Sequence, residues 1–176
     1  MPPHTPRQSL DEPGSNRSDI DARLGETLAT VVSGARRRAV RDGDRQIDTA
    51  HLLHSLLEHD AEVRAVFEGG PQLARLLGYL VQRSIGYGLR WQGSVEDSAA
   101  VPVVTGPDGL SPLAAAALRH AGERAARRGG DGATGTDLLV ALVADPQSRA
   151  VEVLARAGID AAAVSGGREG GVLEAR

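Results

Sequence analysis

Two histidines and a carboxylate recur at helical spacing in one short stretch, at His51, His54 and Glu58. At about 100° per residue they share a narrow sector of a helix, opposite a leucine face (Leu52, Leu53, Leu56 and Leu57). Two imidazoles and a carboxylate match the three-ligand zinc sites that keep an open catalytic position. The alternative is a solvated polar face, because the sequence offers no second cluster that would enclose a metal.

Arginines cluster twice, each time near the end of a long helical pattern: Arg36, Arg37, Arg38 and Arg41, then Arg124, Arg127 and Arg128. Cations at this end of a helix oppose the negative end of its dipole. A second interpretation is a phosphate-binding surface for nucleic acid or a phosphorylated tag. However, Asp42, Asp44 and Asp131 dilute the positive charge, and the net charge of the chain is -3. We therefore expect no nucleic-acid partner.

Three of the few aromatic residues lie close together in the sequence, at Tyr79, Tyr87 and Trp91. Aromatic side chains with a polar end favour half-buried positions and binding surfaces. The other interpretation is that they fill a seam between two halves of the fold.

The sequence contains no catalytic constellation. Ser55 and Ser111 have no local partner that would activate a hydroxyl, and no paired-carboxylate pattern is present. All 20 basic residues are Arg, which excludes a Schiff-base lysine and a P-loop. The absence of Cys excludes thiolate chemistry. We expect a protein without enzymatic activity and without a cofactor.

The elements that position these residues occur twice. Residues 23–57 align without a gap on residues 109–143, at a constant offset of 86 positions. Each copy has a helix-length apolar pattern that ends at a glycine (Gly43 and Gly129), a polar turn, and a second helix that opens with two leucines. Self-similarity of this kind defines a repeat architecture. Together with abundant Ala and Leu and few aromatics, it predicts an all-α tandem repeat of two four-helix units.

The boundaries follow from caps and breakers. We expect helices at about 22–42, opened by Asp19 or Asp21, then from Asp48 or Thr49, around residues 63–67, and from Pro71. The second set is expected at about 111–128, 136–144 and 147–157, with a short last helix in 159–164. This gives a disordered leader (1–18), repeat one (19–85), a connector (86–109), repeat two (110–164) and a flexible tail (165–176).

The repeated motif resembles the double repeat of the N-terminal domain of Clp unfoldases. The most specific matches are IDTAHLL at 47–53, LSP at 110–112 and LLVALVADP at 138–146, and the resemblance covers about 19–164. It implies an eight-helix, pseudo-twofold, non-catalytic module that receives adaptors, substrates and, in the ClpC branch, proteins marked by phosphoarginine. No Walker A motif is present, so the sequence contains no ATPase engine.

The resemblance implies ligand-binding residues at the two motifs, namely Thr49 and His51 in repeat one and Thr136 and Asp137 in repeat two. The ClpC pattern is G-T-E-H-L-L, and its Glu is associated with the guanidinium of phosphoarginine. Here Ala50 stands in that place, whereas Asp137 takes either the Glu or the His position. A carboxylate holds a guanidinium by two hydrogen bonds, and Ala cannot. The alternative is that Thr49, Thr136 and Asp137 only cap helices.

From this we expect a cytoplasmic binding module of the Clp proteolysis system, whose partners are protein or peptide clients, adaptors and Clp ATPase or protease components. No apolar run approaches the roughly 18 residues of a membrane span. A second possibility is sequestration of a cyclic-peptide antibiotic, because Clp N-domains as a family bind such molecules. A metal-dependent enzyme built on His51, His54 and Glu58 is the remote third.

Overall fold

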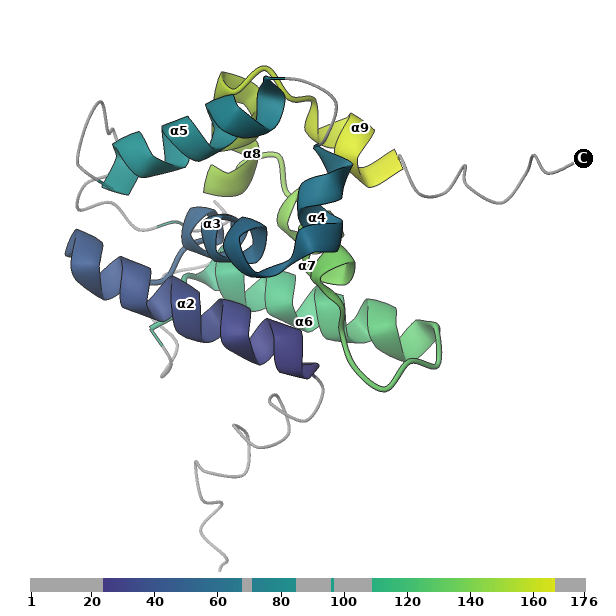
Figure 1. The fold of residues 1–176 in the computed structure, drawn as a ribbon. Helices are drawn as coiled ribbons and strands as arrows, with labels where there is room; N and C mark the ends of the chain where they lie inside the picture. The colour runs from purple at the N-terminus through teal and green to yellow at the C-terminus, as the bar shows by residue number, and fades with distance from the viewer. Residues whose placement is uncertain (1–23, 68–70, 85–95, 97–108, 167–176) are drawn as a thin grey trace, which may run out of the picture.

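The computed structural model describes residues 24–67, 71–84, 96 and 109–166, which fold into helices (Figure 1). The first repeat contains α2 (Glu26–Asp42), α3 (Thr49–His59), α4 (Ala61–Val66) and α5 (Gln72–Ser84). The second contains α6 (Pro112–Arg127), α7 (Gly135–Leu142), α8 (Arg149–Arg156) and the short α9 (Ala161–Gly166). The predicted all-α pair of four-helix units is confirmed. None of the helices in these residues is long and apolar enough to span a membrane.

Two isolated backbone bridges show how the repeats are related. Leu24 pairs with Ala133, and Ile47 pairs with Leu110. Leu110 is the repeat-two equivalent of Leu24, and Ala133 is the equivalent of Ile47, so the two bridges exchange when the repeats exchange. A contact that is repeated with its partners interchanged is what a twofold relation produces. The repeats therefore face each other about a pseudo-twofold axis.

Glycines end the two long helices as the sequence predicts. Gly43 follows α2 with a φ of 72°, and Gly129 follows α6 with a φ of 68°. Residues with a side chain rarely adopt this left-handed conformation, which lets the backbone turn back immediately after a helix. The turns that follow place α3 and α7 against the helices that precede them.

The helix starts differ from the predictions at two places. α2 begins at Glu26 after Gly25, which has no side-chain cap, and Asp19 and Asp21 lie outside the described residues. α7 is capped by Thr134 rather than by Thr136 or Asp137. The apolar stripes in the sequence located these helices correctly. Their first residues were misplaced, because more than one nearby polar residue is of a type that can cap a helix.

α3 lies at the centre of the fold, in contact with α2, α4, α5, α6, α7 and α8 (Figure 1). Every residue of α3 from Thr49 to Leu57 is buried, including polar ones. The leucines of α3 and α7 form the middle of the core, with Leu52, Leu53, Leu56, Leu138, Leu139 and Leu142 at most 1% exposed. A polar side chain on α3 must therefore find its partners inside the protein.

Candidate functional site

α3 and α7 begin with the same local structure, a capping box. In α3 the Asp48 carboxylate accepts a hydrogen bond from the His51 N–H at 2.9 Å, and His51 Nδ1 accepts one from the Asp48 N–H at 3.1 Å. In α7 Thr134 Oγ1 accepts from the Asp137 N–H at 3.3 Å, and the Asp137 carboxylate accepts from the Thr134 N–H at 2.9 Å. The two boxes occupy equivalent positions in the repeats, but they carry different chemistry.

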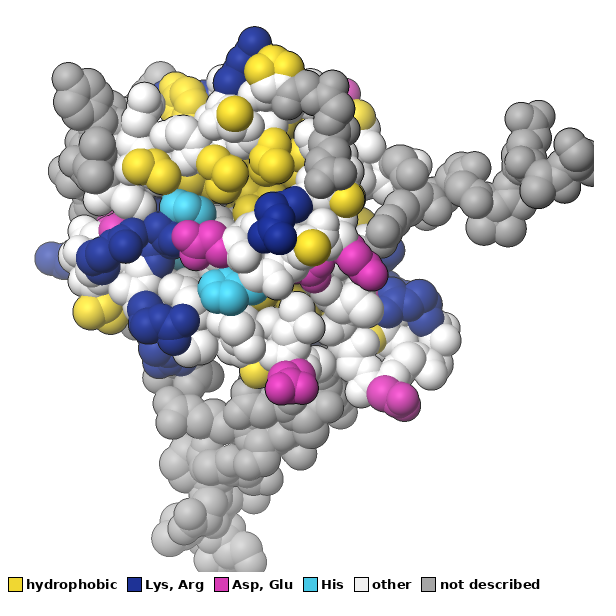
Figure 2. Space-filling view, in the orientation of Figure 1, with side chains coloured by type: hydrophobic (Ala, Val, Ile, Leu, Met, Phe, Trp, Pro, Cys, Tyr) yellow, Lys and Arg dark blue, Asp and Glu magenta, His cyan; other side chains and the backbone are white. Residues whose placement is uncertain are grey.

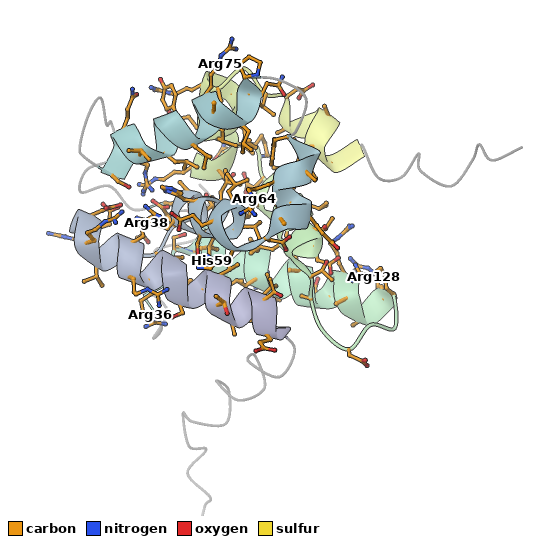
Figure 3. The ribbon with its side chains drawn as sticks, viewed as in Figure 1. Arg36, Arg38, His59, Arg64, Arg75 and Arg128 are labelled. Carbon is orange, nitrogen blue, oxygen red and sulfur yellow. The ribbon has the colours of Figure 1, made fainter. Side chains whose placement is uncertain are left out.

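In repeat two the box carboxylate also holds a guanidinium. Asp137 is 1% exposed, and Arg128 donates to both of its oxygens, from Nη2 to Oδ2 at 2.7 Å and from Nη1 to Oδ1. Arg128 reaches it from the end of α6 (Figure 3). Burial raises the pKa of Asp137, but the hydrogen bonds from Arg128 and Thr134 outweigh it and keep the pKa below its ordinary value. Asp137 is therefore ionised and can bind a guanidinium group.

A cavity of about 690 Å³ opens beside this ion pair. Asp137, Arg124, Arg128 and Thr136 line it from α6 and α7, and Ser165 lines it from α9. Arg124 Nε lies 3.6 Å from Asp137 Oδ1, so two guanidinium groups and one carboxylate share this wall, and the Glu62 carboxylate lines the cavity from α4. The cavity is large enough for a side chain or a short peptide segment.

In repeat one the start of α3 is instead bonded by the connector residue Glu96. The Glu96 carboxylate accepts hydrogen bonds from the Thr49 N–H at 2.9 Å, the Arg149 N–H at 2.7 Å and Ser111 Oγ at 2.7 Å, and also from Thr49 Oγ1. Thr49 Oγ1 in turn accepts from the Ala150 N–H at 3.0 Å. Glu96 thus joins the N-terminal ends of α3, α6 and α8, which favour an anion. Thr49 is buried in this junction.

Asp48 is fully buried and lies between two arginines from opposite repeats. Arg83 of α5 donates to Asp48 Oδ2, and Arg149 Nη1 of α8 donates to the same oxygen at 2.7 Å. Burial raises the pKa of Asp48, but the hydrogen bond and charge of His51 and the two guanidinium groups hold it well below its usual range. This ion cluster connects repeat one to repeat two.

The histidine facet predicted as a possible metal site is not formed. His54 Nε2 lies 3.7 Å from Glu58 Oε1, and Glu58 is paired with Arg38, whereas His51 is directed toward Asp44 and Asp48. In the described part of the chain, no group of three possible ligands contains His54 or Glu58. The solvated polar face is also wrong, because His51 and His54 are 0% and 4% exposed. The central position of α3 buries both.

Burial of His54 predicts an acid-sensitive contribution to stability. Burial and the charge of Arg38 lower the pKa of His54 to about 4, from an ordinary value of 6.5. Between these pH values the unfolded chain binds a proton that the folded protein does not, so the free energy of unfolding falls as the pH falls. Replacing His54 by Gln should remove about 2 kcal/mol of this loss between pH 7 and pH 4. Urea unfolding of both proteins across this range measures it, and parallel profiles would contradict it.

The arginine clusters are mostly paired within the protein. Arg37 donates to Ser33 Oγ at 2.8 Å, Arg38 pairs with Glu58, and Arg36 is exposed and points away from the helices (Figure 3). On the face shown in Figure 2, Arg side chains alternate with carboxylates and histidines rather than forming a field of one sign. This mixture gives no basis for a nucleic-acid surface on that face.

Tyr79 lies at the seam between the repeats. Arg156 of α8 stacks over the Tyr79 ring at 5.8 Å from its centroid and donates to the phenol oxygen at 3.4 Å. Tyr79 also packs against the core. Tyr87 and Trp91, the other two members of the predicted aromatic group, lie outside the described residues.

Sequence reasoning missed Glu96, Arg83 and Arg149. Glu96 is a single carboxylate in a connector without periodicity, and Arg83 and Arg149 read as ordinary arginines at helix ends, so no local signal marks them. The Arg128–Asp137 pair was within reach, because a short turn joins α6 to α7. The pair was missed because the second arginine cluster was interpreted as opposing the helix dipole.

The arrangement of the helices is that of the N-terminal domains of Clp ATPases. A solved N-terminal domain of the caseinolytic protease associated chaperone ClpD from Arabidopsis thaliana matches with a TM-score of 0.58 and 19% identity, over 82% of this chain and 90% of that one. The N-terminal domain of the ClpV1 ATPase of the Escherichia coli EAEC Sci1 T6SS matches with a TM-score of 0.56 and 18% identity, over 89% and 91%. No family model matches the sequence, and no curated protein matches it.

At these identities the likeness defines the fold, and the resemblance noted in the sequence is confirmed at that level. A third solved chain, titled as a structural investigation of a malarial protein secretion system, has the same fold with a TM-score of 0.55 and 16% identity, over 82% of this chain and 90% of that one. Function must therefore be argued from the site.

Proposed function

We propose that this chain is a non-catalytic receptor that captures protein or peptide clients for a Clp-type proteolysis system, and that the cavity beside Asp137 is its working site. The fold supports the general role. The observation that carries the proposal is the buried Asp137 carboxylate, which holds a guanidinium through both oxygens beside an open cavity.

The chemistry of the wall suits a phosphorylated arginine. Such a side chain presents a guanidinium and a phosphate together. Asp137 would hold the ligand guanidinium, and Arg128, released from Asp137, would join Arg124 in binding the phosphate. The exchange conserves the number of opposite-charge contacts, so displacement of Arg128 leaves no buried charge unpaired.

Repeat one does not offer this chemistry. Ala50 is buried and carries no polar group, and Glu96 already accepts the N–H groups at the N-terminal ends of α3 and α8. We therefore assign one client site to the chain, in repeat two.

Asp137→Asn should weaken binding of a phosphoarginine peptide by about 10- to 100-fold, because an amide cannot pair with a guanidinium through two acceptors. Fluorescence anisotropy with a labelled peptide measures this. The same peptide with unmodified arginine or with phosphoserine should bind more weakly, since each lacks one of the two charges.

The matched control is Asp131→Asn, which removes the same charge from the exposed turn before α7. It should bind like the unmodified protein. Equal affinities for Asp137→Asn and the unmodified protein, with both folded by circular dichroism, would exclude this site.

The direction of the effect on proteolysis is a separate question. A receptor that delivers clients accelerates their loss when added to a Clp degradation assay, whereas one that competes with the ATPase for clients slows it. Absence of any effect over a wide concentration range would count against a role in the Clp system.

A further inference from the structure

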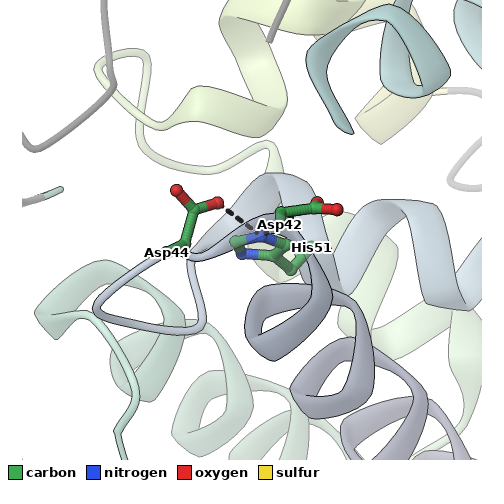
Figure 4. Close-up of side chains that lie close together, drawn as sticks. All are labelled: Asp42, Asp44 and His51. Carbon is green, nitrogen blue, oxygen red and sulfur yellow. Dashed lines mark ion pairs between the residues drawn. The ribbon is translucent and has the colours of Figure 1, made fainter. Parts of the chain in front are cut away.

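Three possible metal ligands from α2, the turn after it and α3 converge in repeat one (Figure 4). Asp42 ends α2, Asp44 lies in the turn, and His51 is in the first turn of α3. His51 Nε2 lies 2.9 Å from Asp44 Oδ2 and 3.8 Å from Asp42 Oδ2, and the ligand atoms all lie within 4.8 Å of one another. Ligands of a tetrahedral zinc ion are separated by about 3.3 Å, given bond lengths near 2.0–2.1 Å. Small side-chain shifts would bring these atoms to that spacing.

Two of the three ligand atoms lack hydrogen bonds in spite of their burial. Asp42 Oδ2 makes none, and its side chain is 6% exposed. His51 Nε2, on a fully buried side chain, makes none of acceptable geometry, although Asp44 is near. Buried polar atoms are nearly always satisfied, and an ion is one explanation for those that are not.

The other side of the His51 ring is arranged as in metal-binding histidines. Nδ1 accepts from the Asp48 N–H in the capping box but also lies 2.9 Å from Asp48 Oδ1, so in the other tautomer its proton is donated to that carboxylate instead. This tautomer leaves the Nε2 lone pair free for a metal ion. A carboxylate behind a ligating histidine orients the ring and raises its basicity. Asp48 is itself held in place by Arg83 and Arg149.

Repeat two places a cation at the equivalent point. The equivalents of Asp42 and His51 are Arg128 and Asp137, and the Arg128 guanidinium binds Asp137 there. In repeat one the residue at the end of the long helix is the acidic Asp42 instead of an arginine, so carboxylates face the imidazole of His51. Arg83 Nη2 lies 3.5 Å from Asp44 Oδ2, but Asp42 Oδ2 has no hydrogen-bond partner, and a bound cation would supply one there.

We propose that Asp42, Asp44 and His51 form a binding site for a divalent transition-metal ion, and that zinc fits it best. The ion binds the Nε2 lone pair of the ring that is protonated on Nδ1, takes one oxygen from each carboxylate and keeps a fourth position for water. The Asp44 side chain is 26% exposed, which gives the ion a path from solvent. The bound ion joins the end of α2 to the start of α3.

The test is titration of the full-length, tag-free chain, stripped with EDTA, with zinc chloride. Calorimetry should show one zinc ion bound per chain, and the melting temperature should rise by several degrees, because the ion binds only the folded state. Magnesium should have no effect, since it demands octahedral oxygen ligation. Asp44→Asn should weaken zinc binding at least about tenfold. The control Asp131→Asn, in the equivalent turn of repeat two, should leave zinc affinity unchanged.

Zinc binding that Asp44→Asn does not weaken would place the ion elsewhere in the chain and overturn the proposal, as would the absence of binding at roughly 100 μM zinc. If Asp44→Asn does not fold, the proposal is tested by NMR on the unmodified chain. Zinc must then shift the imidazole ¹⁵N resonances of His51, and shifts confined to other histidines would overturn the proposal. The peptide-binding test at Asp137 is independent of either result.

Discussion

Replacing Asp48 by Asn is expected to lower the free energy of unfolding by about 3–5 kcal/mol, because it removes the buried carboxylate that two guanidinium groups share. Arg83 and Arg149 both donate to Asp48 Oδ2, and all three side chains are at most 8% exposed. An amide of the same shape still caps α3 through its oxygen. The loss would therefore report the charge and not the cap.

Asp60→Asn is the matched control for this change. Asp60 caps α4 in the same way, accepting from the N–H groups of Glu62 and Val63, but none of the described ion pairs contains it. It should cost about 1 kcal/mol or less. Urea unfolding at pH 7 measures both variants. If Asp48→Asn cost no more than Asp60→Asn, the ion cluster would contribute nothing to holding the repeats together.

The repeat and the helix ends could be predicted because their causes are local. The apolar stripes of α2 and α6 and the glycines that follow them act within one helical turn, so sequence spacing alone locates them. The constant offset makes the two bridges equivalent, but that they form depends on how the repeats dock. The start of α7 was misplaced, because Thr134 and Thr136 are both acceptable caps by type and the packing of the turn selects one.

The site was predicted only where its parts are close in sequence. Asp137 was expected to offer a carboxylate to a guanidinium, and the fold supplies one from Arg128, nine residues earlier. In contrast, Arg149 and Asp48 are 101 residues apart, and Glu96 is 47 residues from Thr49. No periodicity encodes such contacts, because they depend on how the second repeat docks on the first.

The two repeats share one backbone arrangement but carry different polar side chains at equivalent positions. In repeat one, Asp48, Arg83, Arg149 and Glu96 form hydrogen bonds and ion pairs at the buried start of α3. In repeat two, the start of α7 faces a cavity, and Arg128 binds its carboxylate, with Arg124 Nε 3.6 Å away. Under the proposed function, this difference would let repeat two exchange its internal partner for a client.

Glu96→Gln is expected to lower the free energy of unfolding by about 3 kcal/mol, although it only replaces a carboxylate oxygen by an NH₂ group and leaves the side chain nearly the same size. The four hydrogen bonds to Glu96 all come from donors on Thr49, Ser111 and Arg149. A glutamine places its own NH₂ donor against some of these donors and removes the negative charge that the helix N-terminal ends favour. Each donor left unsatisfied in a buried place costs about 1–3 kcal/mol.

Hydrogen exchange separates this effect from a general loss of stability. The amides of Thr49 and Arg149 donate directly to Glu96, so in Glu96→Gln they should exchange about 10- to 100-fold faster than in the unmodified protein, beyond any change in the α6 interior. Glu62→Gln, at an exposed first-turn position of α4, is the control and should cost less than about 1 kcal/mol. If the α6 interior accelerated as much as Thr49 and Arg149, Glu96 would contribute only to global stability. Selective acceleration at these two amides would identify Glu96 as the group that protects the N-terminal ends of α3 and α8 from exchange.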